Sequence, residues 1–301
     1  MIEIVQAPPY AAVQDHGFTR GRSWGLPPAG AMDPMLLDLA NCLAGAPSGA
    51  AAIEWALGSG AIRSDIPVRI AVVGPAALWL DDQPVTRCTL ACTVPAGVTL
   101  SIVPGAHHRF SYLAIAGGIA VPEILGSRST YLPGALGGQH GRCLRAGDRL
   151  EAGSDVRPHP EIEITPTGRS EAAEDDVTIR VTRGPQWARF DRHAREAFFA
   201  ARFTVAPASD RMGYRLNGPL IRSMETATLP SEAACVGAVQ IPDGGEPIVL
   251  MPDGPTVGGY AKLAVVLQAD LRRLAQCGPG RGIRFQEVSL EAARACYSLF
   301  R

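Results

Sequence analysis

Residues 234–251 read ACVGAVQIPDGGEPIVLM, two apolar runs on either side of a turn rich in proline and glycine. The β-branched residues of the two runs, Ala234–Ile241 and Ile248–Met251, and the breakers between them are typical of short strands. The same pattern predicts further strands at Val68–Val73, Val98–Val103, Tyr112–Ile115, Val177–Thr182, Leu263–Gln268 and Ile283–Val288. Many short strands and frequent turns predict a mainly β fold of barrels or sandwiches rather than a doubly wound sheet.

Helices are few, and their ends are well marked. Asp33 is a favourable N-cap, Pro34 suits the first helical position, and Gly45 suits the end of a helix that carries Met35–Leu43. Two further short helices are predicted at Asp270–Gln276, before Gly278, and at Leu290–Leu299, after a capping Ser289.

The chain divides into two globular stretches. Its 301 residues, 47% hydrophobic and 19% charged, are enough for one large core or two ordinary ones. A segment of mixed prolines and acidic residues is typical of a linker. The predicted division is an N-terminal β subdomain at 1–153, a linker at 154–176 and a C-terminal β-barrel subdomain at 177–301.

Composition excludes several classes of partner. The formal net charge is −1 and no run of basic residues occurs, so nucleic acid is not expected as a partner. Apolar runs such as Ile70–Leu80 are too short and interrupted to span a membrane, and no signal peptide precedes them. Seven cysteines without a Cys-x-x-Cys pair indicate reduced thiols. We therefore expect a cytoplasmic protein.

Lys262 is the only lysine in the chain, which rules out several motifs at once. A phosphate-binding P-loop and a Ser-x-x-Lys acylation motif both need a lysine in a setting that position 262 does not provide. Its neighbours also differ from those of a biotin-carrying lysine. His-Glu-x-x-His is absent, and the adjacent His107 and His108 would point to opposite faces of a strand. No metal site is expected.

A set of motifs spread over nearly the whole chain resembles one family, the carboxyltransferase-domain proteins known as the C subunit of 5-oxoprolinase, allophanate hydrolase subunit 2 or KipA-like proteins. In chain order these motifs are VQDHG (13–17), WGLPPAGAMD (24–33), YLAIAGGI (112–119), LGSRSTYLPG (125–134), GGQHGR (137–142), SDRMGYRL (209–216), Ser231-Glu232, GAVQIP (237–242), and Asp253, Thr256 and GGY (258–260) leading to Asp270-Leu271. Each motif is a weak pattern alone, whereas the ordered set is specific.

The resemblance implies two cyclophilin-like β-barrel subdomains with a few short helices. It also implies the C subunit of an ATP-dependent 5-oxoprolinase, which hydrolyses 5-oxoproline to glutamate with an A subunit and a KipI-like B subunit. ATP would be used through the complex. The first alternative is a carboxyltransferase acting on urea or a related amide, with biotin on a separate carrier. The second is a KipA-like regulatory protein that binds a partner without catalysis.

Candidate site residues in the first half follow from this amide chemistry, which needs proton transfer, positioning and stabilisation of charge on oxygen. Asp15 is either a turn residue or a catalytic carboxylate. Arg128 would pair a substrate carboxylate or a structural acid. Tyr131 and His140 flank the glycine-rich stretch 134–141, which is either a simple turn or a backbone cradle for an oxyanion.

The second half contributes Glu232, Asp253 and Lys262 as candidate catalytic residues and Tyr260 as a candidate substrate contact. A lysine retained where the chain otherwise uses arginine favours a role for a compact ammonium, as a base or as a stabiliser of charge on oxygen. We place the site where the two halves, or this chain and a partner, come together.

Departures from the family pattern concern the substrate rather than the fold. Phe18 and Arg20 interrupt the usual continuation of the first loop, Ala29 stands where serine is common, and Ala233 stands where glycine is common. These positions belong to two loops expected to face a ligand.

Overall fold

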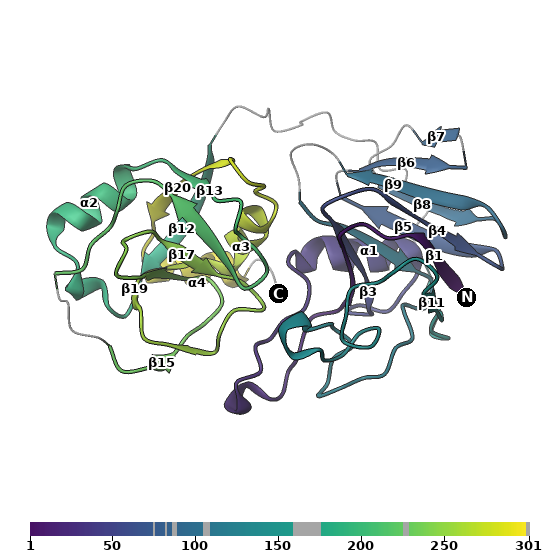
Figure 1. Ribbon diagram of the computed structural model, residues 1–301, viewed down its shortest axis with the longest axis horizontal. Helices are drawn as coiled ribbons and strands as arrows, with labels where there is room; N and C mark the ends of the chain where they lie inside the picture. Colours follow the sequence, from purple (N-terminus) through teal and green to yellow (C-terminus); the bar gives the residue numbers. More distant parts are fainter. Residues whose placement is uncertain are drawn as a thin grey trace. The chain divides into compact units, whose positions relative to one another are not determined.

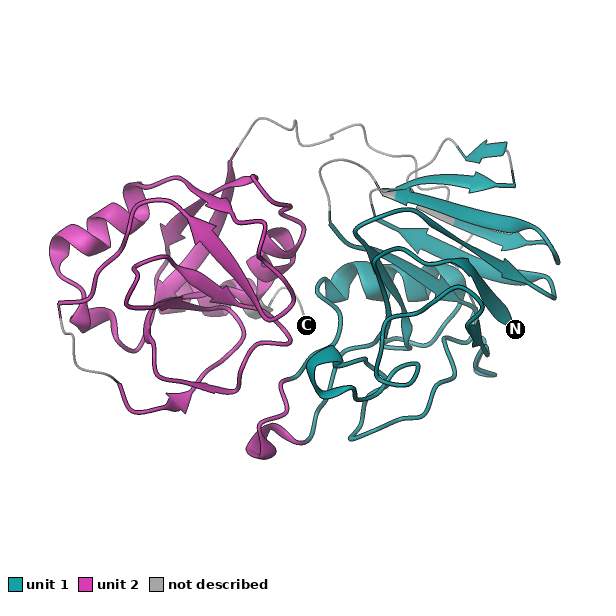
Figure 2. Ribbon diagram, viewed as in Figure 1, with its two compact units in different colours: residues 1–20, 28–170 teal, residues 21–27, 171–301 magenta. Residues whose placement is uncertain are grey.

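The computed structural model describes residues 1–74, 76–81, 83–85, 89–104, 109–158, 176–224 and 229–298. The chain forms two compact units, one of residues 1–20 and 28–170 and the other of residues 21–27 and 171–301 (Figure 2). Most of the predicted linker, and both His107 and His108, lie outside the described residues. In the ranges given above, no helix combines the length and apolar character needed to cross a bilayer.

The strands of unit 1 form two antiparallel sheets (Figure 1). The six-stranded sheet has the order β11-β1-β4-β9-β6-β7, with β1 (Ile2–Gln6), β4 (Gly60–Ser64), β6 (Ala76–Leu80), β7 (Gln83–Val85), β9 (Thr99–Pro104) and β11 (Arg149–Leu150). The five-stranded sheet has the order β2-β3-β10-β5-β8, with β2 (Tyr10–Gln14), β3 (Ala52–Ala56), β5 (Val68–Val73), β8 (Thr89–Val94) and β10 (Ser111–Ile115). Unit 1 is thus a two-sheet structure.

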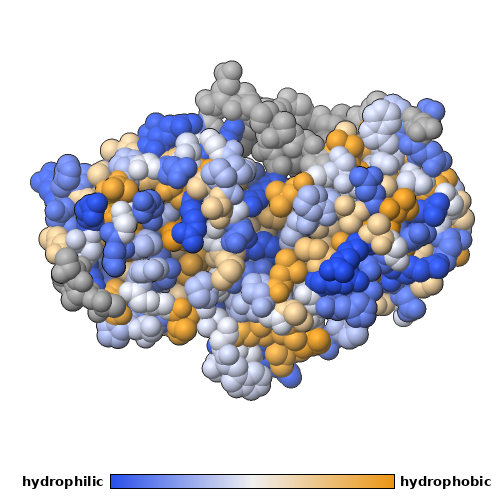
Figure 3. Space-filling model, viewed as in Figure 1, coloured by the Kyte–Doolittle hydropathy of each residue, from blue (hydrophilic) through white to orange (hydrophobic). Residues whose placement is uncertain are grey.

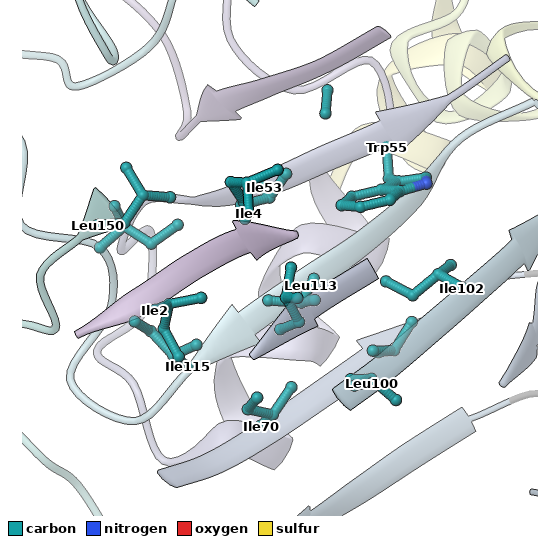
Figure 4. Packing of buried hydrophobic residues seen from close by; sticks show 14 of the residues in the cluster. Ile2, Ile4, Ile53, Trp55, Ile70, Leu100, Ile102, Leu113, Ile115 and Leu150 are labelled. Atoms are coloured by element: carbon teal, nitrogen blue, oxygen red, sulfur yellow. The ribbon is translucent and has the colours of Figure 1, made fainter. Parts of the chain in front are cut away.

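Alternating residues of both sheets build the core of unit 1 (Figure 4). Ile2 and Ile4 come from β1, whereas Ile53 and Trp55 come from β3 in the other sheet, and all are almost fully buried. Successive side chains of a strand point to opposite faces, so the residues between them turn away from this core. On β10, for example, Leu113 and Ile115 belong to the core cluster, whereas Tyr112 and Ala114 do not.

The helix α1 (Pro34–Ala44) contacts β5 and β10 of the five-stranded sheet. Its ends are those predicted. The Asp33 carboxylate accepts a hydrogen bond from Leu36 N at 3.3 Å, Pro34 occupies the first turn, and Gly45 ends the helix with a left-handed backbone. This fixes the chain on both sides of the helix, including the loop that precedes Asp33.

Unit 2 contains a closed barrel of seven strands, which confirms the predicted mainly β class. Its strands, in the order around the barrel, are β12 (Val177–Arg183), β19 (Ala261–Val266), β16 (Ala238–Ile241), β17 (Ile248–Leu250), β14 (Gly213–Asn217), β13 (Phe203–Val205) and β20 (Gly282–Glu287). The barrel closes through the parallel pair β12 and β20, which lie side by side in Figure 1; the other pairs are antiparallel.

Each strand predicted from sequence overlaps an observed one. The largest difference is at Ala234–Ile241, where the barrel strand begins only at Ala238, because Gly237 adopts a left-handed backbone with φ 87°. The residues just before this turn form a separate ribbon, in which β15 (Glu232–Ala233) pairs with β18 (Val257–Gly258).

The remaining helices of unit 2 are α2 (Arg192–Ala200), α3 (Gln268–Ala275) and α4 (Leu290–Ser298). The α3 and α4 helices match the predictions, and the Ser289 hydroxyl accepts from Ala292 N at 3.2 Å as the expected cap of α4. Sequence analysis missed α2, although Asp191 caps it by accepting from Ala194 N at 2.7 Å. Single-turn 3-10 helices occur at Arg22–Trp24, Leu132–Gly134 and Trp187–Arg189.

Residues 21–27 belong to unit 2 although they interrupt the sequence of unit 1. The Arg22 guanidinium donates a hydrogen bond to the backbone oxygen of Ala234, just after the ribbon. Trp24 is 78% exposed at the tip of this segment. On the face drawn in Figure 3, charged and apolar side chains are interspersed over each unit.

Candidate functional site

Asp15 directly follows β2 and holds the loop that carries Arg128. Its Oδ1 accepts hydrogen bonds from Gly17 N, Ser127 Oγ and Ser129 Oγ at 2.8, 2.5 and 2.6 Å. Its Oδ2 accepts from Arg128 N at 2.6 Å. A buried carboxylate with four donors organises the backbone around it. The turn role of Asp15 is thus visible in the structure, while its catalytic role stays a prediction.

The Arg128 side chain is half-exposed and only loosely engaged. Its Nε donates to Val121 O at 3.0 Å, and Nη1 donates to the exposed Glu123 carboxylate at 3.3 Å. An exposed ion pair of this kind contributes little stability. The predicted pairing of Arg128 with a substrate carboxylate therefore remains open to test.

Packing within unit 1 accounts for the glycines of the stretch 134–141. A Cβ on Gly137 would lie 2.0 Å from Ser129 O, and a Cβ on Gly138 would lie 1.9 Å from Thr130 Oγ1. Both glycines also have positive φ. The loop that follows Tyr131 is thus pressed against the 127–130 segment. His140, also at positive φ, is exposed beside it, and the substrate contacts of Tyr131 and His140 stay predictions.

Glu54 of β3 is the centre of a buried network that sequence analysis did not identify. Its carboxylate accepts from Tyr10 Oη at 3.0 Å, from Tyr112 Oη at 2.5 Å and from Met32 N at 2.7 Å. Tyr112 in turn accepts from Asp33 N at 2.8 Å. Burial, together with the nearby Glu54 charge, raises the pKa of Tyr112 well above its ordinary value. The network anchors the residues just before α1.

His16 belongs to the first motif and forms an ion pair with α1. Its Nε2 lies 2.9 Å from Asp38 Oδ1. This hydrogen bond is the main cause of a pKa for His16 above the ordinary value. Sequence analysis did not single out His16, and the pair joins the first loop to the helix.

In unit 2 the structure brings together two of the predicted catalytic residues. Lys262 Nζ, which is buried, lies 2.5 Å from Glu232 Oε1 on the ribbon. Gln186 Nε2 donates to the same carboxylate oxygen at 2.6 Å, and Gln186 Oε1 accepts from Lys262 N at 3.0 Å. The bond to Lys262 is the main cause of a lowered pKa for Glu232. A buried ammonium beneath a partly exposed carboxylate is suited to stabilising charge on a substrate oxygen.

Gln240 lies next to this pair. It is the cross-strand partner of Lys262 between β16 and β19, so the two side chains share one face of the barrel wall. Gly258, the ribbon partner of Glu232, passes over it, and a Cβ there would lie 2.9 Å from Gln240 Nε2. Gln240 is the glutamine of the motif GAVQIP, but the sequence alone does not show that it pairs with Lys262 across two strands.

Asp253 has a different partner. The Arg211 guanidinium donates to it in bidentate fashion, with Nε to Oδ2 at 2.9 Å and Nη2 to Oδ1 at 2.8 Å. Both side chains are buried. Tyr260, by contrast, is 47% exposed between the ribbon and β19. Because Arg211 occupies both oxygens of Asp253, a structural role competes with its predicted catalytic one, which stays a prediction.

The structure defines each unit by itself. A site formed jointly by Asp15, Arg128 and His140 of one half and Glu232, Asp253 and Lys262 of the other therefore stays a prediction. Across the portion of the chain given above, no three His, Cys, Asp or Glu side chains gather as a metal site would require.

A family model described as carboxyltransferase domain, subdomain A and B, matches residues 24–287. The chain therefore belongs to the carboxyltransferase-domain family, which the sequence motifs indicated.

Individual relatives cover almost the whole chain. The 5-oxoprolinase C subunit of Escherichia coli is 37% identical over 295 residues, which are 97% of this chain and 93% of that protein. The 5-oxoprolinase C subunit of Haemophilus influenzae is 35% identical, with 97% and 93% covered. The urea amidolyase of Lachancea kluyveri is 36% identical over 97% of this chain, which spans only 17% of that protein.

Solved structures also match this chain over nearly its whole length. The crystal structure of the Kluyveromyces lactis urea amidolyase matches with a TM-score of 0.87 and 31% identity. The match covers 99% of this chain and 19% of the amidolyase chain. The Kluyveromyces lactis urea carboxylase matches with a TM-score of 0.88 and 30% identity, over 99% of this chain and 28% of the other.

Proposed function

We propose that this chain is the C subunit of an ATP-dependent 5-oxoprolinase, which hydrolyses 5-oxoproline to glutamate together with partner subunits. The observation that supports the proposal most strongly is coverage. Two bacterial proteins named as the C subunit of 5-oxoprolinase match this chain nearly end to end, whereas in the urea amidolyases the match is a small part of a much longer chain.

The Lys262–Glu232 pair supports lactam chemistry. A lactam is an unreactive amide, and opening it requires stabilisation of the charge that develops on its oxygen, as well as proton transfer. Lys262 would supply a buried positive charge, and the carboxylate of the half-exposed Glu232 would accept and donate protons at the surface of the ribbon. In this proposal Asp15 and Asp253 are further catalytic residues. The substrate-binding residues are Arg128, Tyr131, His140 and Tyr260.

The partners in this proposal are an A subunit and a KipI-like B subunit, with ATP bound through the complex. The chain has no P-loop, so the nucleotide would be held largely by the partners. The complex would act in the cytoplasm on a small lactam, without nucleic acid or membrane.

Carboxyl transfer to urea or a related amide is the second candidate. It is favoured by the family description and by the high TM-score to the urea carboxylase structure. Biotin would then be carried on another chain. A regulatory KipA-like protein is the third candidate, and the departures at Phe18, Arg20 and Ala29 favour a member that binds without catalysis.

The test is glutamate release from 5-oxoproline and ATP by this chain purified with its candidate A and B subunits. Activity that is lost on omission of this chain supports the proposal. Lys262→Met and Asp253→Asn are then compared with Arg192→Met, which removes a cation that is 90% exposed. If the complete mixture releases no glutamate but carboxylates urea in the presence of a biotin carrier, the second candidate replaces the first. Unchanged activity in both Lys262→Met and Asp253→Asn contradicts the assigned site.

A further inference from the structure

Two buried donors in the barrel wall of unit 2 are underused. Lys262 and Gln240 are only 3% and 4% exposed, and they face each other across β16 and β19. In the part of the molecule that the structure describes, no acceptor lies within hydrogen-bonding distance of Gln240 Nε2. The Lys262 ammonium carries three hydrogens, and its contact is with a single oxygen of Glu232.

Such an arrangement opposes stability, because a buried donor that has left water without gaining an acceptor raises the free energy of the folded state. Buried polar groups in native proteins are nearly always paired. Gln240 Nε2 is such an exception, and beside it the Lys262 ammonium has hydrogens to spare beyond its one contact with Glu232. Together they indicate an acceptor oxygen that arrives from outside the chain.

The ribbon shows where such an oxygen would enter. Gly258 lies so close to Gln240 that a Cβ there would be 2.9 Å from Nε2 and would force the amide to shift. Opposite Gly258 stands Glu232, whose carboxylate is 43% exposed although it contacts the buried Lys262. The Gln240 amide thus lies next to a glycine, and the Lys262 ammonium lies next to a carboxylate that solvent reaches.

We propose that the Lys262 ammonium and the Gln240 amide jointly bind the carbonyl oxygen of an amide or lactam, while Glu232 accepts an N–H of the same group. Gln186 donates to Oε1 of Glu232, which leaves Oε2 for the substrate. Gln240, which belongs to the motif GAVQIP but was not among the residues predicted for the site, is therefore a substrate-binding residue. This assignment rests on the proposed function for the choice of 5-oxoproline, but its chemistry also fits urea.

A binding role and a structural role for Gln240 predict opposite effects on stability. Gln240→Leu removes a donor that has no acceptor, so the melting temperature should stay the same or rise. The matched control is Gln14→Leu in unit 1, where the amide donates to Thr130 O at 3.0 Å and to Tyr10 Oη at 3.3 Å. Gln14→Leu removes both of these hydrogen bonds and should lower the melting temperature.

The single lysine offers a direct assay of binding. Protein grown with lysine labelled with ¹³C at Cε gives one side-chain signal, from Lys262, in the full-length chain. We expect 5-oxoproline to shift this signal saturably, whereas proline, which has the ring and carboxylate without the lactam carbonyl, should not. In Gln240→Leu and Gln240→Glu the dissociation constant should rise about tenfold, as expected for one lost hydrogen bond to a polar ligand.

The outcomes separate this inference from the proposed function. A shift with urea but not with 5-oxoproline, weakened in the Gln240 variants, supports the donor pair and contradicts the 5-oxoprolinase assignment. A shift with 5-oxoproline of equal affinity in wild type and both variants overturns the donor pair and leaves the assignment intact. If neither amide shifts the Lys262 signal, or if Gln240→Leu melts as low as Gln14→Leu, the donor pair is also overturned.

Discussion

Replacement of Asp253 by asparagine tests whether this residue is catalytic or structural. Asp253 and Arg211 are both buried, and two hydrogen bonds of 2.8 and 2.9 Å join them. The amide of Asp253→Asn can accept one of these bonds but leaves the Arg211 charge without a counter-charge. Breaking a buried pair in this way costs about 3–5 kcal/mol. Since the amide preserves one acceptor, we expect about 3 kcal/mol, or about 6–12 °C in melting temperature.

The measurement is urea-induced or thermal unfolding of wild type, Asp253→Asn and a matched control. The control is Glu196→Gln, the same carboxylate-to-amide change in the exposed pair with Arg192, which should cost at most about 0.5 kcal/mol. A double variant, Arg211→Met with Asp253→Leu, should recover much of the lost stability. Asp253→Asn that melts like wild type yet abolishes activity would refute this reasoning and make Asp253 catalytic.

The other predictions concern unit 1. Tyr112→Phe removes a hydroxyl that donates to Glu54 and accepts from Asp33 N, and it should destabilise the protein by about 1–3 kcal/mol in chemical denaturation; no loss would mean that water replaces the hydroxyl. Gly137→Ala should unfold or strongly destabilise the protein, because its Cβ would collide with Ser129 O. The control is Gly147→Ala, which is also at positive φ but has no heavy atom within 4 Å of the added Cβ, so it should cost only backbone strain of about 1–2 kcal/mol. Equal losses in melting temperature for the two variants would contradict the packing argument. Because the pKa of His16 is raised in the folded state, its pair with Asp38 contributes stability below the unfolded pKa of about 6.5 and loses it as the pH rises through the folded value. Asp38→Asn should therefore destabilise more at about pH 5.5 than at about pH 8.5 in parallel denaturation curves, and a pH-independent difference would count against the ion pair.

Local signals explain which elements of the fold were predictable. Asp33, Pro34 and Gly45 each act within a few residues, so α1 could be bounded from sequence. The strand at 248–250 was likewise visible from its apolar run and flanking breakers. The helix α2 was missed because its sequence, RHAREAFFA, is dominated by charged and small residues, and its buried face consists only of Ala194 and Phe198. The Asp191 cap was its one clear signal.

The candidate site was predictable as a set of residue types but not as a set of pairs. Sequence placed Glu232, Asp253 and Lys262 in one group because the family resemblance implies an amide chemistry that needs carboxylates and a positive charge, and because Lys262 is the single lysine. In the structure Lys262 forms an ion pair with Glu232, whereas Asp253 forms one with Arg211. Such pairings depend on strand register and on the path of the ribbon, which are set by contacts between distant segments. The Glu54 network escaped notice for the same reason.

The parallel pairing of β12 with β20 has a consequence for the synthesis of the protein. These are the first and last strands of the barrel, and their register joins Val177 to Ile283 and Val181 to Glu287. A ribosome must therefore synthesise the 98 residues 184–281 that separate the two strands, and then β20 itself, before β12 gains its neighbour on this side. Until then one edge of β12 has unpaired backbone groups that other chains can pair with. Stalled or prematurely ended translation products of this protein should consequently be prone to aggregation and should need chaperones more than the finished chain does.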